Sequence, residues 1–462
     1  AEVHAAREDA IVAPGRSDFP NQVNNVLCFP FIFRGALDVG ATTINEAMKL
    51  ATVRAIADLA LAESNDVVAG AYGGEELKFG TEYLIPKPFD PRLIAKIAPA
   101  VAQAAMDSGV ATRPITDMDA YIERLNQQIY KTNLLMRPVF AQAKKDIKRI
   151  VLAEGEDERM LHAAQQIVSQ KLAYPILIGR KEIIEERLQA QGLTIQAGKD
   201  FDLVDLVDNP YYEESWKTYY DLQKRKGVTE EMARRRLKAN STLVGALLVR
   251  LGHADGLVCG TMGRFHDHFA VMEEVIGYNN PEKEAFAMNA LISNKGNFFI
   301  ADTYVIHDPT AEQLAQGTLM CAKEIQRFGI KPKVALVSNS NYGTHTDEDS
   351  VKMQQALQIV RKADPDLEID GEMQADAALD EKLRKQIFPE TTLQGSANLL
   401  VMPNVEAANI SYNLLRVNAT NGITVGPILM GLNKPVQIVT PISTVRRIVN
   451  MIALAAVDAQ RQ

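Results

Sequence analysis

The most informative segment of the sequence lies near the C-terminus: Thr424-Val425-Gly426-Pro427-Ile428-Leu429-Met430-Gly431-Leu432-Asn433-Lys434-Pro435-Val436, continuing through Gln437-Ile438-Val439-Thr440-Pro441 to Arg447. We interpret Thr424 to Val436 as a strand and a turn. A helix is expected to follow from Ser443. Short apolar runs that resemble this one recur through most of the preceding chain.

These runs predict a parallel sheet. They lie at Ile150–Ala153, Pro175–Gly179, Gly256–Gly260, Phe298–Asp302, Val334–Ser338 and Asn398–Pro403. Helical segments are expected between them, from Met160 to Gln170 and from Lys181 onward. Strands that alternate with helices at this spacing form βαβ units. Each run ends in small or polar residues, and open α/β sheets bind ligands just beyond such strand ends.

Composition limits the possible functions. The chain has 462 residues, enough for about three domain-sized units, with 47% hydrophobic and 23% charged residues. A net charge of −8 argues against a general binder of nucleic acid or anionic membranes. Three distant cysteines, Cys28, Cys259 and Cys321, form neither a disulfide framework nor a metal motif. With no secretory signal and no apolar run of about 18 residues, we expect a cytoplasmic protein.

Residues 1–115 form a first, helix-rich block. Helices are expected from Ile44 to Ala62 and from Arg92 to Ser108. The block begins in mid-pattern without an initiator Met, so we expect that an N-terminal part has been truncated or processed away. Residues 116–148 are interpreted as a helical linker, and a solvent-bridging helix between domains is favoured over a binding role.

The segment from Asn21 to Asp38, NQVNNVLCFPFIFRGALD, resembles the end of the nucleotide-binding domain of malic enzymes. The resemblance implies that Asn24 and Asn25 line malate and the nicotinamide, although the bare dipeptide could instead cap the following helix. The dinucleotide glycine fingerprint is absent, and Gly73-Gly74 does not replace it. The tyrosine and lysine acid/base pair and the carboxylate ligands for Mg or Mn are expected upstream of Ala1. This chain alone is therefore expected not to decarboxylate malate.

From Lys148 to the end, the chain resembles phosphate acetyltransferases. The matching motifs are Leu152–Glu156, Lys224–Thr229, Asp302-Thr303, Ile369–Ala378, Gly395–Pro403 and the stretch from Thr424. Both resemblances together are typical of the C-terminal part of hybrid bacterial malic enzymes of the NADP-preferring, oxaloacetate-decarboxylating type. They imply an α/β protein, with an incomplete Rossmann-like nucleotide-binding segment followed by a two-lobed parallel-sheet domain. The implied domains are 1–115, a linker at 116–148, and 149–462, divided into lobe one (149–285 plus 436–462) and lobe two (286–435). A homo-oligomer is also implied.

The transferase chemistry itself is expected to be missing. Phosphate acetyltransferases use arginines to hold the phosphate and an aspartate to take the thiol proton, because developing charge must be stabilised in a water-poor cleft. Aligned with that family, the arginine positions carry Gln223, Ala270 and Pro441, and the aspartate position carries Arg447. All these positions depart together, so we expect a cleft that has lost its phosphate clamp and its base.

What remains of the cleft could still bind acetyl-CoA. The polar loop Ser338–Thr344 is expected to present backbone N–H groups to phosphate. Lys224–Lys226 and Arg234–Arg236 offer cations, although a solvated helix face explains the latter equally well. The residues assigned to an acetyl-CoA effector cleft are Arg264, His266, His268, Ser340, Asn341, Gly343, Thr344, Asn398, Asn409, Tyr412 and Pro441.

The resulting hypothesis is a regulatory module that senses acetyl-CoA inside a protein that converts malate to pyruvate with NADP and Mg or Mn. Two alternatives stay open: an active phosphate acetyltransferase and a purely structural oligomerisation module. His266 and His268 are two residues apart on an expected helix and so point apart, which makes a metal site there unfavourable. No Gly-x-Ser-x-Gly elbow of a hydrolase occurs, and Cys259 is interpreted as a buried residue, not a nucleophile.

Overall fold

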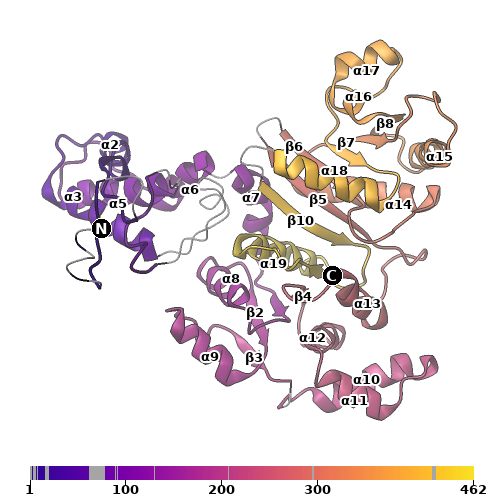
Figure 1. The fold of residues 1–462 in the computed structure, drawn as a ribbon, viewed down its shortest axis with the longest axis horizontal. Coiled ribbons are helices and arrows are strands. Elements are labelled where there is room, and N and C mark those ends of the chain that lie inside the picture. Colours follow the sequence, from indigo (N-terminus) through magenta and orange to yellow (C-terminus); the bar gives the residue numbers. More distant parts are fainter. Residues whose placement is uncertain are drawn as a thin grey trace. The chain divides into compact units, whose positions relative to one another are not determined.

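The computed structural model (Figure 1) describes residues 3, 7, 9–15, 20–61, 79–88, 90, 92–129, 131–206, 208–293, 296–418 and 423–462. The chain divides into two compact units, residues 1–134 and 135–462. Within the described ranges, no helix combines the length and the apolar character that crossing a bilayer requires. The expected α/β class is confirmed, because the second unit contains two sheets flanked by helices.

The first unit is helical. Its described elements are η1 (Asn25–Leu27), α2 (Phe31–Asp38), α3 (Glu46–Leu61), α5 (Leu93–Asp107) and α6 (Met118–Ile129). The long helix α5 packs against both α2 and α3. Gly35 lets α2 approach α5 closely, because a Cβ there would lie 2.4 Å from the carbonyl oxygen of Ala98. The two helices expected in this block are present with slightly shorter bounds.

The segment expected to be one linker helix is two helices that belong to different units. Tyr121 and Leu125 of α6 are buried in the core of the first unit. Leu135 and Met136 of α7 (Lys131–Ala143) are buried in the core of the second. The solvent-bridging interpretation therefore differs from the structure, because each helix buries an apolar face on its own unit.

The first sheet of the second unit is parallel throughout, in the order β11-β4-β1-β2-β3. Its strands are β1 (Arg149–Leu152), β2 (Tyr174–Ile178), β3 (Asp202–Val204), β4 (Gly256–Cys259) and β11 (Val436–Ile438). The accompanying helices are α8 (Glu158–Ser169), α9 (Lys181–Ala190), α10 (Tyr212–Gln223), η2 (Lys224–Lys226), α11 (Glu230–Leu237), α12 (Ser241–Arg250), α13 (Phe265–Val275) and α19 (Val445–Ala459). We call this part lobe one.

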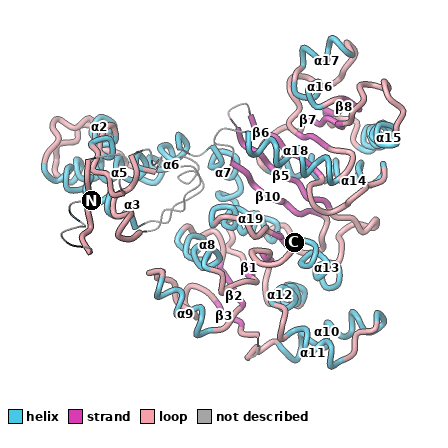
Figure 2. The backbone as a smooth tube through the Cα atoms, in the orientation of Figure 1, coloured by secondary structure: helices cyan, strands magenta, loops and turns pink. Residues whose placement is uncertain are grey.

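The second sheet is mixed, in the order β10-β5-β6-β9-β7-β8 (Figure 2). Its strands are β5 (Phe286–Ser293), β6 (Gly296–Ala301), β7 (Lys333–Val337), β8 (Glu368–Met373), β9 (Leu399–Val401) and β10 (Ile423–Met430). Its helices are α14 (Ala311–Arg327), α15 (Glu348–Ala363), α16 (Ala375–Leu379), α17 (Glu381–Ile387) and α18 (Val405–Asn418). Strand β5 runs antiparallel to both β10 and β6, an arrangement that the parallel-sheet expectation did not include. We call this part lobe two.

Helix α19 lies where the two lobes meet. It packs against α8, β1, β4 and β11 of lobe one and against β10 of lobe two. Its apolar residues, including Ile448, Ile452 and Ala455, are fully buried in a core that also contains residues of both sheets. The helix therefore holds the lobe-one sheet in a fixed position relative to lobe two. It begins shortly after β11 ends, at the carboxyl edge of the lobe-one sheet.

Candidate functional site

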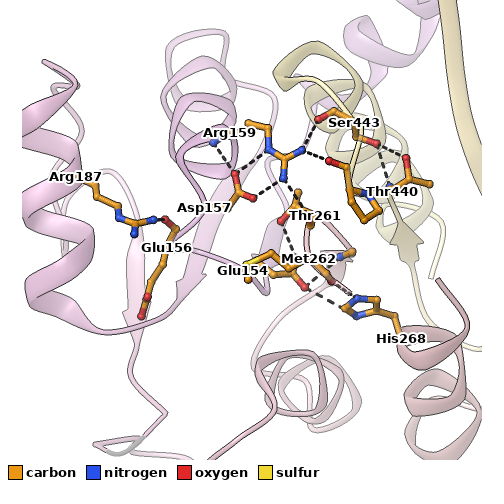
Figure 3. A network of polar contacts seen from close by, with 12 residues as sticks. Glu154, Glu156, Asp157, Arg159, Arg187, Thr261, Met262, His268, Thr440 and Ser443 are labelled. Carbon is orange, nitrogen blue, oxygen red and sulfur yellow. Dashed lines mark hydrogen bonds and ion pairs between the residues drawn. The ribbon is translucent and has the colours of Figure 1, made fainter. Parts of the chain in front are cut away.

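The candidate site lies at the carboxyl edge of the lobe-one sheet. Strands β1, β4 and β11 are adjacent and parallel, so the loops that follow them lie side by side. These loops carry Glu154, Thr261 and Pro441. Figure 3 shows Glu154 and Thr261 beside Asp157 and Arg159, which lie at the start of α8. This is the edge at which open α/β sheets bind ligands.

Arg159 ties these three loops together. Its guanidinium forms a two-pronged ion pair with Asp157, with Nε–Oδ1 at 3.0 Å and Nη2–Oδ2 at 2.6 Å. It also donates to the carbonyl oxygens of Pro441 (2.5 Å), Ser443 (3.0 Å) and Thr261 (3.0 Å). Burial by itself would raise the pKa of Asp157, but the hydrogen bonds from Arg159 outweigh it and the pKa is lowered. The planar fork of arginine suits this work because it donates in several fixed directions.

Glu154 is the buried carboxyl group at this edge. It accepts hydrogen bonds from the backbone N–H of Gly260 at 3.0 and 3.2 Å and from the Thr261 hydroxyl at 3.4 Å. Burial raises the pKa of Glu154 to about 7, although these hydrogen bonds act in the opposite direction. A carboxyl group that titrates near neutrality can exchange a proton, but its bonds to Gly260 also make it a tie between β1 and β4.

His268 completes the network from α13. Its Nε2 lies 2.6 Å from the carbonyl oxygen of Met262, so Nε2 must carry the hydrogen. Its Nδ1 lies 2.8 Å from the Thr242 hydroxyl and 3.9 Å from Glu154. Burial lowers the pKa of His268, which favours the neutral ring. The ring therefore supports the loop after β4, and both of its nitrogens are occupied.

Lobe two contributes a second ordered loop, after β6. The buried carboxylate of Asp302 accepts hydrogen bonds from the backbone N–H groups of Ala287, Tyr304, Val305 and Ile306. Burial nevertheless raises the pKa of Asp302 to about 6. The loop places the ring of Tyr304 against that of Phe265 on α13, with centroids 4.8 Å apart. The carboxyl edges of the two lobes thus touch through these rings.

The predicted phosphate loop Ser338–Thr344 follows β7 and is braced by β8. Glu372 accepts from the Ser340 hydroxyl at 2.6 Å and from the Gly343 N–H at 2.7 Å. The N–H groups of residues 340 to 345 all donate inside the protein: Ser340 to Ser338, Asn341 to Thr344, Tyr342 and Gly343 to Glu372, Thr344 to Asn341 and His345 to Ser340. A phosphate would have to replace some of these bonds, so binding by this loop stays a prediction.

Asn398 does not lie with the other predicted site residues. It immediately precedes β9, and its side chain accepts from the N–H of Lys333 and donates to the carbonyl of Lys331. These residues are at the amino ends of β9 and β7, the edge of the sheet opposite the candidate site. Its assignment to the cleft is therefore incorrect, because a residue before a parallel strand and one after it lie at opposite edges.

Two predicted residues on α18 lie beside the loop after β6. Asn409 donates to the carbonyl oxygen of Thr303 at 3.4 Å. Tyr412 is buried, with the guanidinium of Arg416 5.8 Å from its ring centroid. Both are thus close to the point where the lobes touch, which agrees with their predicted position but leaves their role toward a ligand untested.

Arg264, His266 and Pro441 are all exposed at the lobe-one edge. Arg264 pairs with Asp267 at 2.9 Å and points into solvent. His266 lies edge-on to the ring of Phe265. The side chain of Pro441 makes no polar contact, and only its carbonyl oxygen is used, by Arg159.

The positions where the sequence departs from phosphate acetyltransferases are now placed. Gln223 is buried and donates to the carbonyl oxygen of Glu274 at 2.8 Å. Gln437 is buried and bonds both the N–H and the carbonyl of Leu429. Arg447, on α19, has a buried Nε without a hydrogen-bond partner among the described residues. The side-chain amides of Gln223 and Gln437 are thus hydrogen-bonded to backbone groups, whereas Nε of Arg447 could still donate to a ligand.

The two basic runs are mostly engaged at the surface. Lys224 pairs with Asp221 at 2.6 Å, and Arg236 pairs with Glu274 at 2.8 Å. The guanidinium of Arg234 lies 3.6 Å from the ring centroid of Trp216. These contacts favour a solvated, structurally occupied helix face over a free phosphate site.

In the first unit, Asn24 caps η1 by accepting from the N–H of Val26 at 3.0 Å, and Asn25 is exposed. Capping, the alternative function of this dipeptide, is therefore present, while the role toward malate stays a prediction. Gly73-Gly74 lies outside the described residues. No group of three or more His, Cys, Asp or Glu side chains in the described ranges could hold a metal, so we derive no step through one.

Comparisons with known proteins follow the same division. Residues 134–456 match the family model of phosphate acetyl/butaryl transferases. The phosphate acetyltransferase of Corynebacterium glutamicum is 32% identical over 340 residues, covering 72% of this chain and 99% of that protein. The structure of the EutD phosphotransacetylase from Staphylococcus aureus aligns with a TM-score of 0.63 and 30% identity, covering 71% of this chain and 98% of that one.

The whole chain is also similar to a longer protein. The NADP-dependent malic enzyme of Salmonella typhimurium is 60% identical over 454 residues, which cover 98% of this chain but 60% of that enzyme. The chain thus spans about 60% of the length of this relative. The predicted resemblance to both kinds of protein is confirmed.

Proposed function

The chain belongs to the phosphate acetyl/butaryl transferase family, and we propose that its family domain is a regulatory module that has lost the transferase reaction and senses acetyl-CoA. The module would serve an NADP-dependent, oxaloacetate-decarboxylating malic enzyme that converts malate to pyruvate in the cytoplasm. NADP and Mg or Mn would supply hydride acceptance and carbonyl polarisation there. The similarity to malic enzymes along the chain supports this part of the proposal.

The observation that carries the proposal is the replacement of charge after β11. A transferase needs fixed cations beside the phosphate and a group that accepts the thiol proton. Here Pro441, at an arginine position of the family, has no charge, and a cation, Arg447, stands where the proton acceptor is expected. An acyl phosphate would meet no clamp at this edge, and a thiol would meet no base.

The retained frame supports ligand binding. Arg159, Glu154 and Asp302 still order the loops at the carboxyl edges of both sheets. The unpartnered Nε of Arg447 is a buried donor that an anionic group of acetyl-CoA would satisfy. Arg447 also lies near enough to lower the pKa of Tyr304, although burial, the larger effect, raises it. This places the cation close to the contact between the lobes.

Calorimetric titration of acetyl-CoA into this chain tests the sensor. We expect saturable binding and no formation of acetyl-CoA from acetyl phosphate and CoA. The variant Arg447→Met should bind at least tenfold more weakly, while Lys362→Met, which removes an exposed lysine on α15, should bind normally. Turnover of acetyl phosphate would establish the active transferase instead, and absence of binding at millimolar ligand would leave only a structural role.

The regulatory part is tested in the complete protein of which this chain is a part. Malate-dependent reduction of NADP is measured with and without acetyl-CoA, for wild type, Arg447→Met and Lys362→Met. We expect acetyl-CoA to change the rate of wild type and of Lys362→Met but not of Arg447→Met. A coupling free energy of about 1–3 kcal/mol would suffice for a change of several-fold or more. An equal response of all three proteins would contradict sensing at this edge.

A second role, in oligomerisation, has its own support. Ile410, Leu414 and Val417 on α18 are 59%, 60% and 79% exposed, and their spacing puts them on one face of the helix. An exposed apolar stripe of this kind is typical of an interface. We propose a homo-oligomer that uses this face. Light scattering should show Leu414→Glu to be smaller than wild type, and an unchanged mass would reject this face.

A further inference from the structure

A cavity of about 470 Å³ lies at the other end of β11 from the candidate site. Strand β11 begins at Val436, which lines the cavity, and runs away from it toward Pro441. Its lining combines residues of α14, the two chain segments between the lobes, the ends of β10 and β11, and the C-terminal end of α19. We call this cavity the hinge pocket.

The hinge pocket is built on both chain segments that cross between the lobes. One crossing contains Asn279 and Asn280, and the other contains Gly431 and Lys434. The crossings are bonded to each other, because the carbonyl oxygen of Gly431 accepts from the N–H of Asn279 at 3.0 Å and from the amide of Asn280 at 3.3 Å. Helix α14 and the end of α19 close the remaining sides.

Part of the pocket lining is a cluster of charges in which Glu324 is buried and Arg327 and Asp458 are half-buried. Arg327 pairs with Glu324, and its Nη1 lies 2.6 Å from Asp458. Arg461 also faces this cluster, since its charge opposes the rise in pKa that burial imposes on Glu324 and Asp458. Two arginines therefore balance two carboxyl groups, and the cluster has no net charge to offer a ligand.

Lys323 and Lys434 also line the pocket but do not belong to this charge cluster. Neither has an ion-pair or hydrogen-bond partner within the described ranges, although the chain as a whole carries a net charge of −8. They come from opposite sides of the pocket, Lys323 from α14 and Lys434 from the crossing before β11. Two unpaired ammonium groups that face one cavity favour a ligand with two negative charges.

The apolar part of the pocket lining favours an organic ligand. Leu319, Met320, Leu429, Leu432 and Pro435 supply an apolar lining, and Gln316 is a neutral polar neighbour. The volume is typical of small-molecule sites, and polar and apolar residues share the lining. A bare inorganic anion would leave these walls wet, whereas an organic anion would cover them.

We propose that the hinge pocket binds a small organic dianion, a dicarboxylate or a phosphate monoester, between Lys323 and Lys434. The site is separate from the acetyl-CoA edge and does not depend on it. A dianion bound between Lys323 and Lys434 would connect α14 of lobe two to the crossing that leads into β11 of lobe one. Occupancy therefore stabilises one arrangement of the lobes over others.

The proposal is tested by titrating three probes at constant ionic strength: glutarate, glycerol 3-phosphate and inorganic phosphate. Binding is followed by calorimetry and by the rise in unfolding temperature. The proteins are wild type, Lys323→Ala/Lys434→Ala and a control, Lys199→Ala/Lys362→Ala, which loses the same charge from exposed sites elsewhere.

We expect one organic probe to bind saturably to wild type and to the control, and at least tenfold more weakly to Lys323→Ala/Lys434→Ala. Stronger binding of glutarate identifies a dicarboxylate site, and stronger binding of glycerol 3-phosphate identifies a phosphate monoester site. Equal affinity of all three proteins, or inorganic phosphate as the strongest ligand, overturns the proposal. Acetyl-CoA binding should be retained by Lys323→Ala/Lys434→Ala, so failure here is distinct from failure of the sensor.

Discussion

Nη1 of Arg159 lies 2.5 Å from the carbonyl oxygen of Pro441, which joins the first turn of α8 to the residue that replaces the arginine of phosphate acetyltransferases. The side chain of Arg159, near the first residues of lobe one, thus bonds to the backbone of the C-terminal segment that completes the same lobe. Because the same guanidinium also bonds Thr261, one residue connects the loops that follow β1, β4 and β11.

Replacing Arg159 by Ala should destabilise the second unit by about 2–4 kcal/mol, because Asp157 and three carbonyl oxygens lose their partner in a poorly solvated place. Urea unfolding of the second unit measures the loss. Arg159→Lys should recover only a minor part, since a point charge cannot reproduce the planar fork. Full recovery by lysine would mean that charge alone matters here.

Glu154 should make stability depend on pH. Burial raises its pKa to about 7 from the ordinary value of 4.5 for a glutamate side chain, so the folded state binds more protons than the unfolded state between these values. Its contribution is therefore complete below pH 4.5 and is lost as the pH rises to about 7. Across this window, wild type should lose roughly 3 kcal/mol relative to Glu154→Gln.

The measurement is the unfolding free energy of both proteins between pH 4.5 and 8. Glu156→Gln is the control, because the hydrogen bond from Arg180 lowers the pKa of Glu156, so this group stays ionised across the window and its variant should give a curve parallel to that of wild type. Parallel curves for wild type and Glu154→Gln would show that Glu154 is already ionised at low pH.

Gly260→Ala should be far more damaging than Gly192→Ala. Both glycines have positive φ, +102° and +65°, so each substitution carries backbone strain of about 1–2 kcal/mol. At Gly260 a Cβ would also lie 2.4 Å from the carbonyl oxygen of Val439, while at Gly192 it meets nothing within 4 Å. The extra crowding should add about 1–3 kcal/mol in thermal unfolding. Equal losses would mean that β4 and β11 separate easily.

Arg327→Met should cost about 3–5 kcal/mol, because Glu324 and Asp458 would lose the arginine that pairs with both and keep only the exposed Arg461 nearby. The triple variant Glu324→Gln/Arg327→Met/Asp458→Asn should regain most of this. The loss should also be smaller at pH 5 than at pH 8, since the two carboxyl groups can then be protonated. Chemical unfolding at both pH values measures the loss of unfolding free energy. A loss that does not change with pH would mean that packing, not charge, causes it.

Much of lobe one could be predicted from local pattern. The runs that became β1, β2 and β4 are continuous and buried, so apolar residues alone mark them. Strand β5 escaped the strand assignment because Asn289 interrupts its apolar run, although one of its antiparallel partners, β6, is the next strand in the chain. Its other partner, β10, lies far along the chain, and that pairing leaves no local signal.

The candidate site could be predicted only in part. His268 was assigned to the edge where it lies because it follows the run Gly256–Gly260, whereas Pro441 was assigned from the family resemblance. Arg159 was missed, although an Asp cap followed two residues later by Arg at the start of an amphipathic helix is a usable signal. Its carbonyl partners come from elements that only the tertiary fold brings near. Asn398 was misplaced because adjacency to a strand does not tell which end of the sheet a residue occupies.

The interleaving of the lobes has a consequence for biosynthesis. Strand β11 and helix α19, which complete lobe one, are translated only after all of lobe two. While the ribosome makes lobe two, the nascent lobe-one sheet lacks its outer strand and the helix that covers its core. Lobe two, whose strands are contiguous in sequence, is thus expected to fold first. The incomplete lobe-one segment, from β1 to α13, is then the part of the module that most needs protection by chaperones.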